Sequence, residues 1–329
     1  MRKYLKLSTY NRNGAGKARI DCNSILEQKG FMPINIGGFS NNTILNTIQE
    51  LITTIKLLWK IKKDDIVFVQ IPVFGRLSIL VYKILVTKSP YIIVLIHDLN
   101  SIRFGWKNAL SAEKYILCKS DLIVAHTENM KEAIIEWGVQ SDKIKVLTLF
   151  DYLTQKENRI DRGREKHVTF AGNLDKSGFL RYLGQYNDLQ FTLYGRESSN
   201  IPDVKNVEYA GLFSSDDISC IKGNWGLVWD GDSNETCIGD YGDYLRIIAS
   251  HKLSLYIAAE MPVIVWNHSA LAPFVEKEYL GFSINGLHEI TQRIDMLSDN
   301  DINRIRLSLK KFSVKLRNGE MLSQILNDL

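Results

Sequence analysis

The chain has 329 residues, of which 45% are apolar and 24% are charged, so it is long enough for two globular domains and unlike a fibrous or largely disordered protein. The 41 basic and 37 acidic residues give a net charge of +4, which is too small to indicate nucleic-acid binding. Its four cysteines lie far apart without zinc-ligand spacing, so the sequence predicts neither a disulfide framework nor a metal site, and a reducing cytoplasm is the simplest compartment.

Neither a signal peptide nor a membrane span is predicted. Residues 1–10 contain Arg2, Lys3 and Lys6, which interrupt the apolar run that a signal peptide needs. The best candidate for a span, residues 253–266, contains a glutamate and a proline and is shorter than the roughly 20 residues that cross a bilayer. We therefore expect a soluble or peripheral protein.

Short β-rich runs alternate with longer amphipathic stretches in the first half. Residues 66–71, 91–96 and 121–125 are predicted strands, with a helical stretch at 77–86. Strands buried on both faces appear as continuous apolar runs, and helical crossovers fit a parallel sheet. This pattern predicts a doubly wound α/β domain over residues 1–153.

The same alternation restarts after a charged segment. Residues 154–166 carry eight charges and little that could be buried, which predicts a linker between domains. A second domain is expected over residues 167–329. Its predicted strands are 167–171, 189–194, 226–229 and 262–266. Residues 301–329 are expected to be helical with a break near Asn318, and the last helix could pack back on the N-terminal domain.

Two glycine turns are candidates for binding an anionic ligand. The first, residues 13–19, follows a short strand, and its Gly14 and Gly16 would let backbone amides approach a phosphate. Its spacing fits neither the dinucleotide nor the Walker motif, so an ordinary strand-to-helix turn explains it equally well. The second, residues 170–176, ends with Lys176 and is otherwise an ordinary β-turn. Together the two turns could hold a ligand between the domains.

A carboxylate follows the apolar run at 91–96, where a buried strand is expected to end. Ligands of open α/β sheets bind beyond the carboxyl ends of the strands, and a carboxylate there can act as a general base. Asp98 is therefore the candidate base. The residues alone favour the simpler explanations, a cap for the next helix or a partner that orients His97.

An acidic cluster and a second turn follow the predicted strand 226–229. Asp230, Asp232 and Glu235 resemble the start of a calcium loop, but the glutamate that such a loop needs at its twelfth position is absent. Residues 250–254 precede an apolar run, so their amides and Lys252 could open a helix onto a diphosphate. The alternative for Lys252 is an ordinary solvated lysine.

Residues 48–63 are expected to form an amphipathic helix. One face carries Leu51, Ile52, Ile55, Leu58 and Trp59, and another carries Lys56, Lys60 and Lys63. Such a helix can lie on an anionic membrane surface, where each lysine contributes about 1 kcal/mol. A helix that packs its apolar face on the core and leaves its lysines in solvent is an equally good explanation.

Several segments resemble the bacterial β-1,6-galactofuranosyltransferases of O-antigen and capsule assembly. In the second half they are residues 226–237, 242–246, 251–256 and 261–266. In the first half they are residues 15–21 and 95–98, and the strand exit at 169–173 also matches. The likeness therefore spans nearly the whole chain. A more distant likeness is to the streptococcal glucosyltransferase that extends glycans on serine-rich adhesins, a two-domain GT-B enzyme.

This resemblance implies the GT-B fold, with two Rossmann-like domains facing a cleft, the nucleotide sugar on the C-terminal domain and the acceptor on the N-terminal domain. It also implies a set of UDP-binding residues. They are Gly14, Ala15, Gly16, Lys17, Gly172, Asn173, Lys176, Tyr209, Ser250, His251, Lys252, Leu253 and Ser254. Lys176 stands where the streptococcal relative has arginine, so a bidentate phosphate contact would become a point charge.

We expect an inverting enzyme that transfers galactofuranose from UDP-galactofuranose to a hydroxyl, the 6-hydroxyl of a hexose, of a lipid-linked oligosaccharide. Asp98 would be the general base, and the cluster Asp230, Asp232 and Glu235 would contact the donor sugar. We expect no cofactor or metal, because positive groups and helix dipoles would neutralise the diphosphate. The alternatives are a UDP-glucose-dependent hexosyltransferase and a catalytically silent nucleotide-sugar-binding subunit.

The expected partners are the UDP-sugar, the glycan acceptor and, for a homo-oligomer, further copies of the chain, but not nucleic acid. The expected location is the cytoplasm, with residues 48–63 available for contact with the inner face of the cell membrane.

Overall fold

The computed structural model describes residues 1–7, 14–37, 43–73, 78–158 and 162–329. The chain divides into two compact units: unit 1 comprises Met1–Thr148 and Leu322–Leu329, and unit 2 comprises Leu149–Met321. Within the described ranges, no helix is both long enough and apolar enough to cross a bilayer.

The described part of unit 1 contains a sheet of six parallel strands in the order β2-β1-β3-β4-β5-β6. The strands are β1 (Arg2–Leu7), β2 (Met32–Ile36), β3 (Ile66–Ile71), β4 (Tyr91–Ile96), β5 (Leu122–Ala125) and β6 (Ile144–Val146). All but the first residue of β3 and of β4 are buried. The strands predicted at 66–71 and 91–96 are therefore confirmed, as neighbours at the centre of the sheet.

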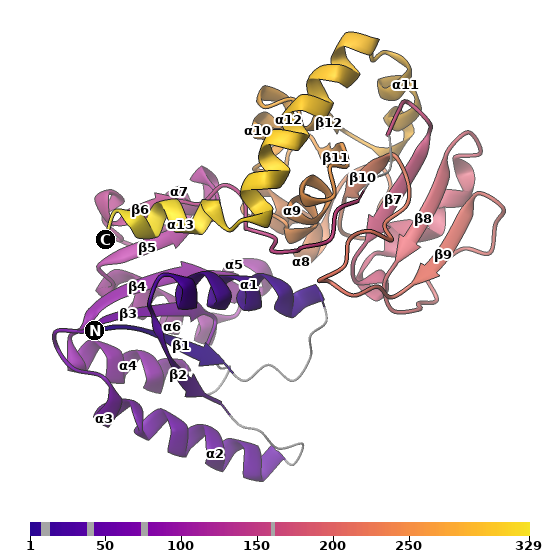
Figure 1. Cartoon of the computed structure of the whole chain (residues 1–329). Helices are drawn as coiled ribbons and strands as arrows, with labels where there is room; N and C mark the ends of the chain where they lie inside the picture. The colour runs from indigo at the N-terminus through magenta and orange to yellow at the C-terminus, as the bar shows by residue number, and fades with distance from the viewer. Residues whose placement is uncertain (8–13, 38–42, 74–77, 159–161) are drawn as a thin grey trace. The chain divides into compact units, whose positions relative to one another are not determined.

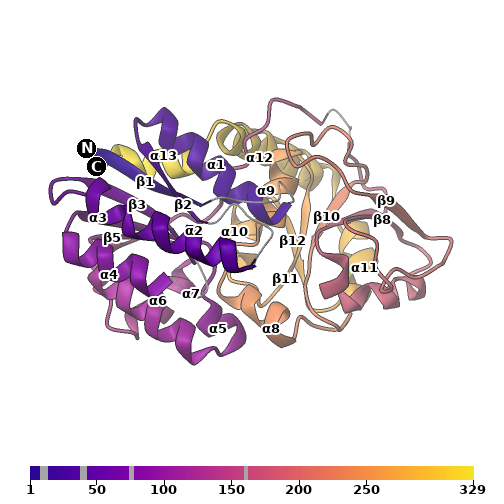
Figure 2. The ribbon, with the colours of Figure 1, turned by 90° about the horizontal axis from the view of Figure 1, so that it is seen from below.

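Helices cover both faces of this sheet. They are α1 (Gly14–Gln28), α2 (Thr43–Ile55), α3 (Leu57–Lys60), α4 (Ser78–Lys88), α5 (Asn100–Phe104), α6 (Lys107–Lys119), α7 (Glu128–Ile135) and the 3₁₀ helix η1 (Ser141–Lys143). Figures 1 and 2 show α1 on one face and α4 and α6 on the other. Thr127 starts α7, because its hydroxyl accepts a hydrogen bond from the Met130 amide at 3.1 Å.

The end of the chain also belongs to unit 1. The Lys29 ammonium donates to Asn327 at 2.8 Å, and the Lys145 ammonium lies 2.5 Å from the Asp328 carboxylate. These contacts join the last residues, 322–329, to the end of α1 and to strand β6.

The described part of unit 2 contains a second sheet of six parallel strands, in the order β12-β11-β10-β7-β8-β9. The strands are β7 (His167–Ala171), β8 (Gln190–Tyr194), β9 (Val207–Gly211), β10 (Trp225–Val228), β11 (Val263–Trp266) and β12 (Gly281–Ile284). The 3₁₀ helices are η2 (Leu174–Lys176), η3 (Gly178–Gln185), η4 (Asp243–Arg246) and η5 (Leu287–Glu289). The two parallel sheets agree with the α/β class expected from the sequence.

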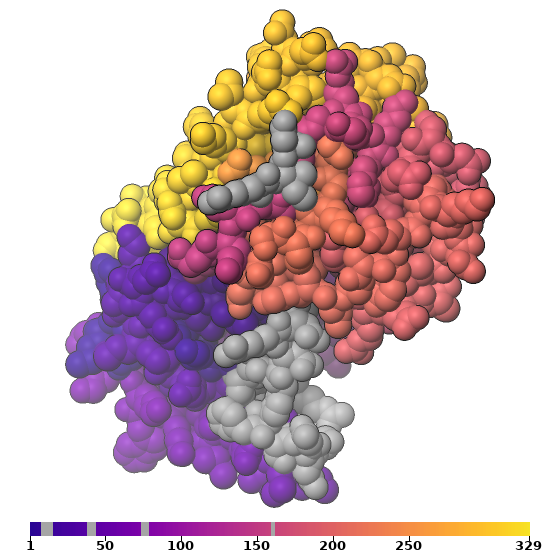
Figure 3. Space-filling view, turned by 45° about the vertical axis from the view of Figure 1, so that its right-hand side comes forward, coloured from indigo at the N-terminus to yellow at the C-terminus, as the bar shows by residue number. Residues whose placement is uncertain are grey.

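The α-helices of unit 2 follow its strands. They are α8 (Gly239–Gly242), α9 (His251–Ala258), α10 (Ala272–Lys277), α11 (Ile290–Asp295) and α12 (Asp299–Arg317), and α13 (Glu320–Asn327) runs from unit 2 into unit 1. Ser298 and Asp301 form a reciprocal capping box at the start of α12. The helix ends at Asn318–Gly319, which confirms the predicted break. Figure 3 shows α12, in yellow, on the surface of unit 2.

The described residues of the segment expected as a linker, 154–158 and 162–166, pack on the rest of unit 2. Asn158 donates to the carbonyls of Ile218 and Ile221 at 2.9 and 2.8 Å. Arg162 is buried, and donates to Ala259 O at 2.9 Å. Burial lowers the pKa of Arg162 to about 10. The expectation that this segment has little to bury is therefore wrong for Asn158 and Arg162, because backbone carbonyls of unit 2 replace the water around their side chains. Residues 159–161 lie outside the described ranges.

Candidate functional site

The candidate site of unit 2 lies where its central strands end. Helix α9 is tied to the end of β7, because the Tyr256 hydroxyl accepts a hydrogen bond from the Ala171 amide at 2.8 Å. The first turn of α9 lies beside the residue that follows this strand: a Cβ on Gly172 would be 2.9 Å from Lys252 Cε. The glycine thus makes room for the lysine stem at the carboxyl edge of the sheet, where ligands of α/β sheets bind.

Lys252 forms an ion pair with Asp230 at this edge. The ammonium lies 2.7 Å from each carboxylate oxygen of Asp230, 3.3 Å from Trp229 O and 5.1 Å from the centroid of the Phe170 ring. The two side chains are 15% and 20% exposed. The sequence analysis assigned the lysine to a diphosphate and the aspartate to a sugar, and the structure places them in direct contact. An anionic ligand would have to share the ammonium with Asp230.

A second lysine lies in the turn after β7. The Lys176 ammonium is exposed and lies 4.5 Å from the centroid of the Tyr241 ring, which α8 supplies. A cation over a ring face is attracted to it, which holds the lysine near α8. Tyr241 was not among the residues expected from the sequence, because nothing in its spacing relates it to the turn that it contacts.

The three acids of the predicted sugar cluster have different neighbours. Asp230 contacts Lys252, as described. Asp232 is exposed and lies against η3, where a Cβ on Gly178 would be 2.1 Å from its Oδ1. The Glu235 carboxylate lies 3.2 Å from His288 Nδ1. Asp232 and Glu235 both keep exposed carboxylates, so both remain candidates for contact with a ligand.

The start of α9 presents only part of the predicted set. Ser250 is its N-cap, and the His251 ring stacks on Tyr152 with centroids 5.1 Å apart. Leu253 and Ser254 are each 1% exposed, so their side chains face the core of unit 2. Any contribution of these two residues to an anion site would come from the backbone, because their side chains are buried.

Two further predicted residues shape the same edge. The Tyr209 hydroxyl donates to Gly195 O at 3.1 Å, directly after β8. Asn173 accepts a hydrogen bond from the Asp175 amide at 3.1 Å and thereby caps η2. The Asn173 side chain therefore has a structural task in the turn that carries Lys176.

In unit 1, the predicted glycine turn enters α1 directly. Gly14, Ala15, Gly16 and Lys17 form the first helical turn, and residues 8–13 lie outside the described ranges. The Lys17 ammonium is buried and lies 2.7 Å from the Asp21 carboxylate, one turn along the helix. This position does not support a contact between the Lys17 side chain and a diphosphate, because the intrahelical ion pair occupies it; the backbone amides of the turn remain candidates.

Asp98 follows β4 and forms an ion pair with Arg103. Its Oδ1 lies 3.0 Å from Arg103 Nη1, and its side chain is 36% exposed. The alternative role of Asp98 as a helix cap belongs to another residue: the Glu113 carboxylate accepts the amides of Asn100 and Ser101 at 2.8 and 3.4 Å, at the start of α5. The arrangement leaves a partly exposed carboxylate at the carboxyl edge of the sheet.

Two charged groups in the same region, the half-buried Arg19 and the buried Glu113, were missed by sequence reasoning. Arg19 donates to the carbonyls of Gln70 and Pro72 at 3.1 and 2.9 Å. Burial lowers the pKa of Arg19, and the negative charge of Asp98 opposes this change. Burial raises the pKa of Glu113, and the charge of Asp98 raises it further. The sequence could have indicated Arg103 as a partner of Asp98, because it lies five residues later, on the helix α5 that follows the strand.

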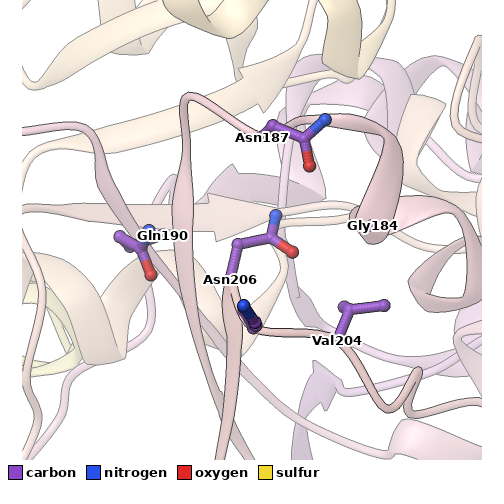
Figure 4. A pocket seen from close by; sticks show the side chains of 6 residues that line it. Gly184, Asn187, Gln190, Val204 and Asn206 are labelled. Carbon is purple, nitrogen blue, oxygen red and sulfur yellow. The ribbon is translucent and has the colours of Figure 1, made fainter.

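A pocket at the opposite edge of the unit 2 sheet is a weaker candidate. Figure 4 shows it between Gly184, Gln190 at the start of β8, and Asn206 just before β9. The Asn206 amide already donates to the carbonyls of Leu183 and Tyr186, at 3.1 and 3.0 Å.

In the described part of the chain, no group of three or more His, Cys, Asp or Glu side chains is placed to hold a metal ion.

Comparison with known proteins gives matches over almost the whole length. The β-1,6-galactofuranosyltransferase WbbI of Escherichia coli K12 is 29% identical, over 99% of this chain and 98% of that protein. Glucosyltransferase 3 of Streptococcus gordonii is 26% identical, over 80% of this chain and 78% of that protein. These identities confirm the resemblance noted in the sequence.

Solved structures match in fold at low identity. Anabaena Alr3699/HepE in complex with UDP has a TM-score of 0.64 at 12% identity, and each chain covers 100% of the other. An E. coli trehalose-6-phosphate structure bound with UDP-2-fluoro glucose has a TM-score of 0.66 at 12% identity, over 100% of this chain and 98% of that one. Both are GT-B proteins, so the fold of two Rossmann-like units is GT-B.

Two family models describe the chain in succession. The N-terminal domain of the glucosyltransferase 3-like family matches residues 4–149, and its C-terminal domain matches residues 168–329. Together they account for nearly every strand and helix described above. The chain therefore belongs to the glucosyltransferase 3-like family of glycosyltransferases.

Proposed function

We propose that this glycosyltransferase moves galactofuranose from UDP-galactofuranose, with inversion, to the 6-hydroxyl of a hexose in a lipid-linked oligosaccharide for surface polysaccharide synthesis. The observation that carries a UDP-sugar donor is the Lys252 ammonium, held over Gly172 at the carboxyl edge of the unit 2 sheet. The full-length similarity to a β-1,6-galactofuranosyltransferase supports the choice of sugar.

Donor binding is assigned to unit 2. Lys252 and Lys176 would place two positive charges near the diphosphate, and the amides at the start of α9 would add hydrogen-bond donors. As the bond to the sugar breaks, negative charge grows on UDP, and fixed positive groups stabilise it. We propose that this suffices without a metal ion.

Asp98 in unit 1 is the proposed general base. The acceptor oxygen attacks the anomeric carbon, its proton passes to the Asp98 carboxylate, and UDP leaves with the electrons of the broken bond. The Arg103 guanidinium, 3.0 Å from Asp98, would hold the carboxylate in place for this proton transfer.

The experiment that tests this proposal measures UDP release with a panel of UDP-sugars and a simple glucoside acceptor, with and without EDTA, followed by mass spectrometry of the product. The proposal expects UDP release with UDP-galactofuranose. It also expects the acceptor to gain the mass of one hexose residue, with or without EDTA. Preference for UDP-glucose would support the second candidate, a hexosyltransferase like the glucosyltransferase 3 relatives. UDP binding without any release would indicate a silent binding subunit, and loss of activity in EDTA would contradict the metal-free mechanism.

A further inference from the structure

Helix α2 is oriented with its polar face toward the protein. Thr54 is fully buried, and Thr53 accepts a hydrogen bond from the Gly37 amide at 3.1 Å and donates to Glu50 O at 3.0 Å. Asn46 donates to the Glu50 carboxylate at 3.0 Å. These polar residues recur at helical spacing and form the side of α2 that faces the rest of unit 1. An ordinary surface helix turns its apolar side toward the protein instead.

The outward side of the same helix is apolar. Its side chains are between 40% and 85% exposed, and Trp59 is the most exposed of them. We call this set the α2 patch: Ile48, Leu51, Ile52, Ile55, Leu58 and Trp59. The stripe continues from α2 into α3, because the Lys56 amide donates to Ile52 O at 3.0 Å and keeps a helical backbone between them. Figures 1 and 2 show α2 on the outside of unit 1, beyond the edge strand β2.

Positive charge lies next to the α2 patch. Lys56, Lys60, Lys62 and Lys63 are all exposed, against one exposed acid, Asp64, in the same stretch. Among the residues that the structure describes, these four lysines form no salt bridge. The surface therefore combines an apolar stripe with three net positive charges, four from lysine less one from Asp64.

We propose that the α2 patch docks unit 1 on an anionic lipid bilayer, with α2 lying in the plane of the interface. The apolar side chains enter the boundary between headgroups and acyl chains, Trp59 takes the interfacial position that tryptophan prefers, and the lysines contact anionic headgroups. A protein partner with an apolar groove would cover the stripe but would leave the lysines without a counter-charge, which favours the bilayer. The inference is independent of which sugar is transferred.

The first test is co-sedimentation of the full chain with vesicles. The chain should bind vesicles of equal parts phosphatidylglycerol and phosphatidylethanolamine, and bind phosphatidylcholine vesicles much more weakly. Trp59→Glu and Ile52→Glu should each lower the partition coefficient by about tenfold or more. Lys60→Gln should lower it about fivefold on anionic vesicles only. Leu307→Glu is the matched control, because Leu307 is 72% exposed on α12 and lies outside the patch.

A second readout separates docking from a general change in solubility. Vesicle binding should shift the tryptophan emission of the wild-type chain to shorter wavelength, and Trp59→Phe should remove most of that shift while keeping the binding. Equal sedimentation of the wild type, Trp59→Glu and Leu307→Glu would overturn the proposal. A second result would also overturn it: the wild-type chain does not bind vesicles and forms a dimer in sedimentation velocity that Trp59→Glu dissociates. The patch would then be an interface between two copies of the chain.

Discussion

The Lys252 ammonium lies at equal distances, 2.7 Å, from the two carboxylate oxygens of Asp230. The pair joins residues 22 positions apart, one after β10 and one in the first turn of α9. Because both side chains keep some exposure, the pair can exchange partners when a ligand arrives. Asp230 positions the lysine, and a diphosphate would compete with it for the ammonium.

Replacing Lys252 should weaken UDP binding. Lys252→Ala removes a charge-assisted contact, which typically costs about 1.5–3 kcal/mol of binding free energy, or roughly 10- to 150-fold in Kd. Isothermal titration calorimetry with UDP measures this loss. Lys222→Ala is the control, because Lys222 pairs with Glu208 on the surface of the same unit. If Lys252→Ala binds UDP like the wild type, Lys252 is an ordinary structural lysine.

Replacing Asp232 should change the selection among donor sugars. Asp232 is exposed at the edge of η3, where its carboxylate can accept hydrogen bonds from sugar hydroxyls. A site built on such contacts discriminates strongly between hydroxyl patterns, because a missing hydroxyl leaves a polar group unpaired. Asp232→Asn should therefore alter the ranking of UDP-sugars in kcat/KM more than the Kd for UDP. An unaltered ranking at normal turnover would contradict the assignment.

The stability of unit 1 should fall in mild acid because of His126. Its side chain is buried and in contact with Ile96 O at 2.5 Å, and burial lowers its pKa from 6.5 to about 4. Since the unfolded chain binds a proton below pH 6.5 and the folded chain does not until about pH 4, the free energy of unfolding decreases as the pH falls through this window. The decrease approaches about 3 kcal/mol near pH 4.

Urea unfolding at several pH values between 7 and 4 measures this effect. His126→Gln should flatten the part of the pH dependence that lies between 6.5 and 4, whereas His268→Gln, at an exposed position, should not. Equal pH dependence in the wild type and both variants would show that His126 does not contribute.

The sequence predicted the central strands well and the edges poorly. Residues 66–71 and 91–96 are continuous apolar runs because both faces of β3 and β4 are covered. The edge strands β2 and β9 were not predicted, since Met32–Ile36 and Val207–Gly211 are partly exposed and carry mixed side chains. Amphipathicity predicted one helix at 48–63, whereas the structure has α2 ending at Ile55, the short α3 at Leu57–Lys60 and no helix at 61–63. It also could not show which face points outward, because that depends on what covers it.

The candidate site was predictable by position and not by pairing. Strand ends are visible in the sequence, and Asp98, Gly172 and Asp230 follow them. The partners are not visible: Glu113 caps α5 from α6, and Tyr241 lies under Lys176 from α8. Such contacts form between segments that only the fold brings together, so no local pattern encodes them.

The most demanding prediction concerns Asp98. Asp98→Asn keeps the shape of the side chain and loses its basicity, so transfer should fall by about 10²–10⁴-fold while the Kd for UDP and the thermal stability stay near their wild-type values. Steady-state UDP release and UDP titration together measure this. Asp142→Asn, at an exposed position in η1, is the control.

A structural role of Asp98 predicts a different result. Because Glu113 already accepts the first amides of α5, a structural role of Asp98 would use its partly exposed ion pair with Arg103. Loss of such a pair typically costs about 0–1 kcal/mol of stability and leaves the chemistry intact. Near-normal turnover by a well-folded Asp98→Asn protein would therefore exclude Asp98 as the base. Asp21 would not be a simple replacement, because it is buried and paired with Lys17, so the search would move to the exposed Asp232.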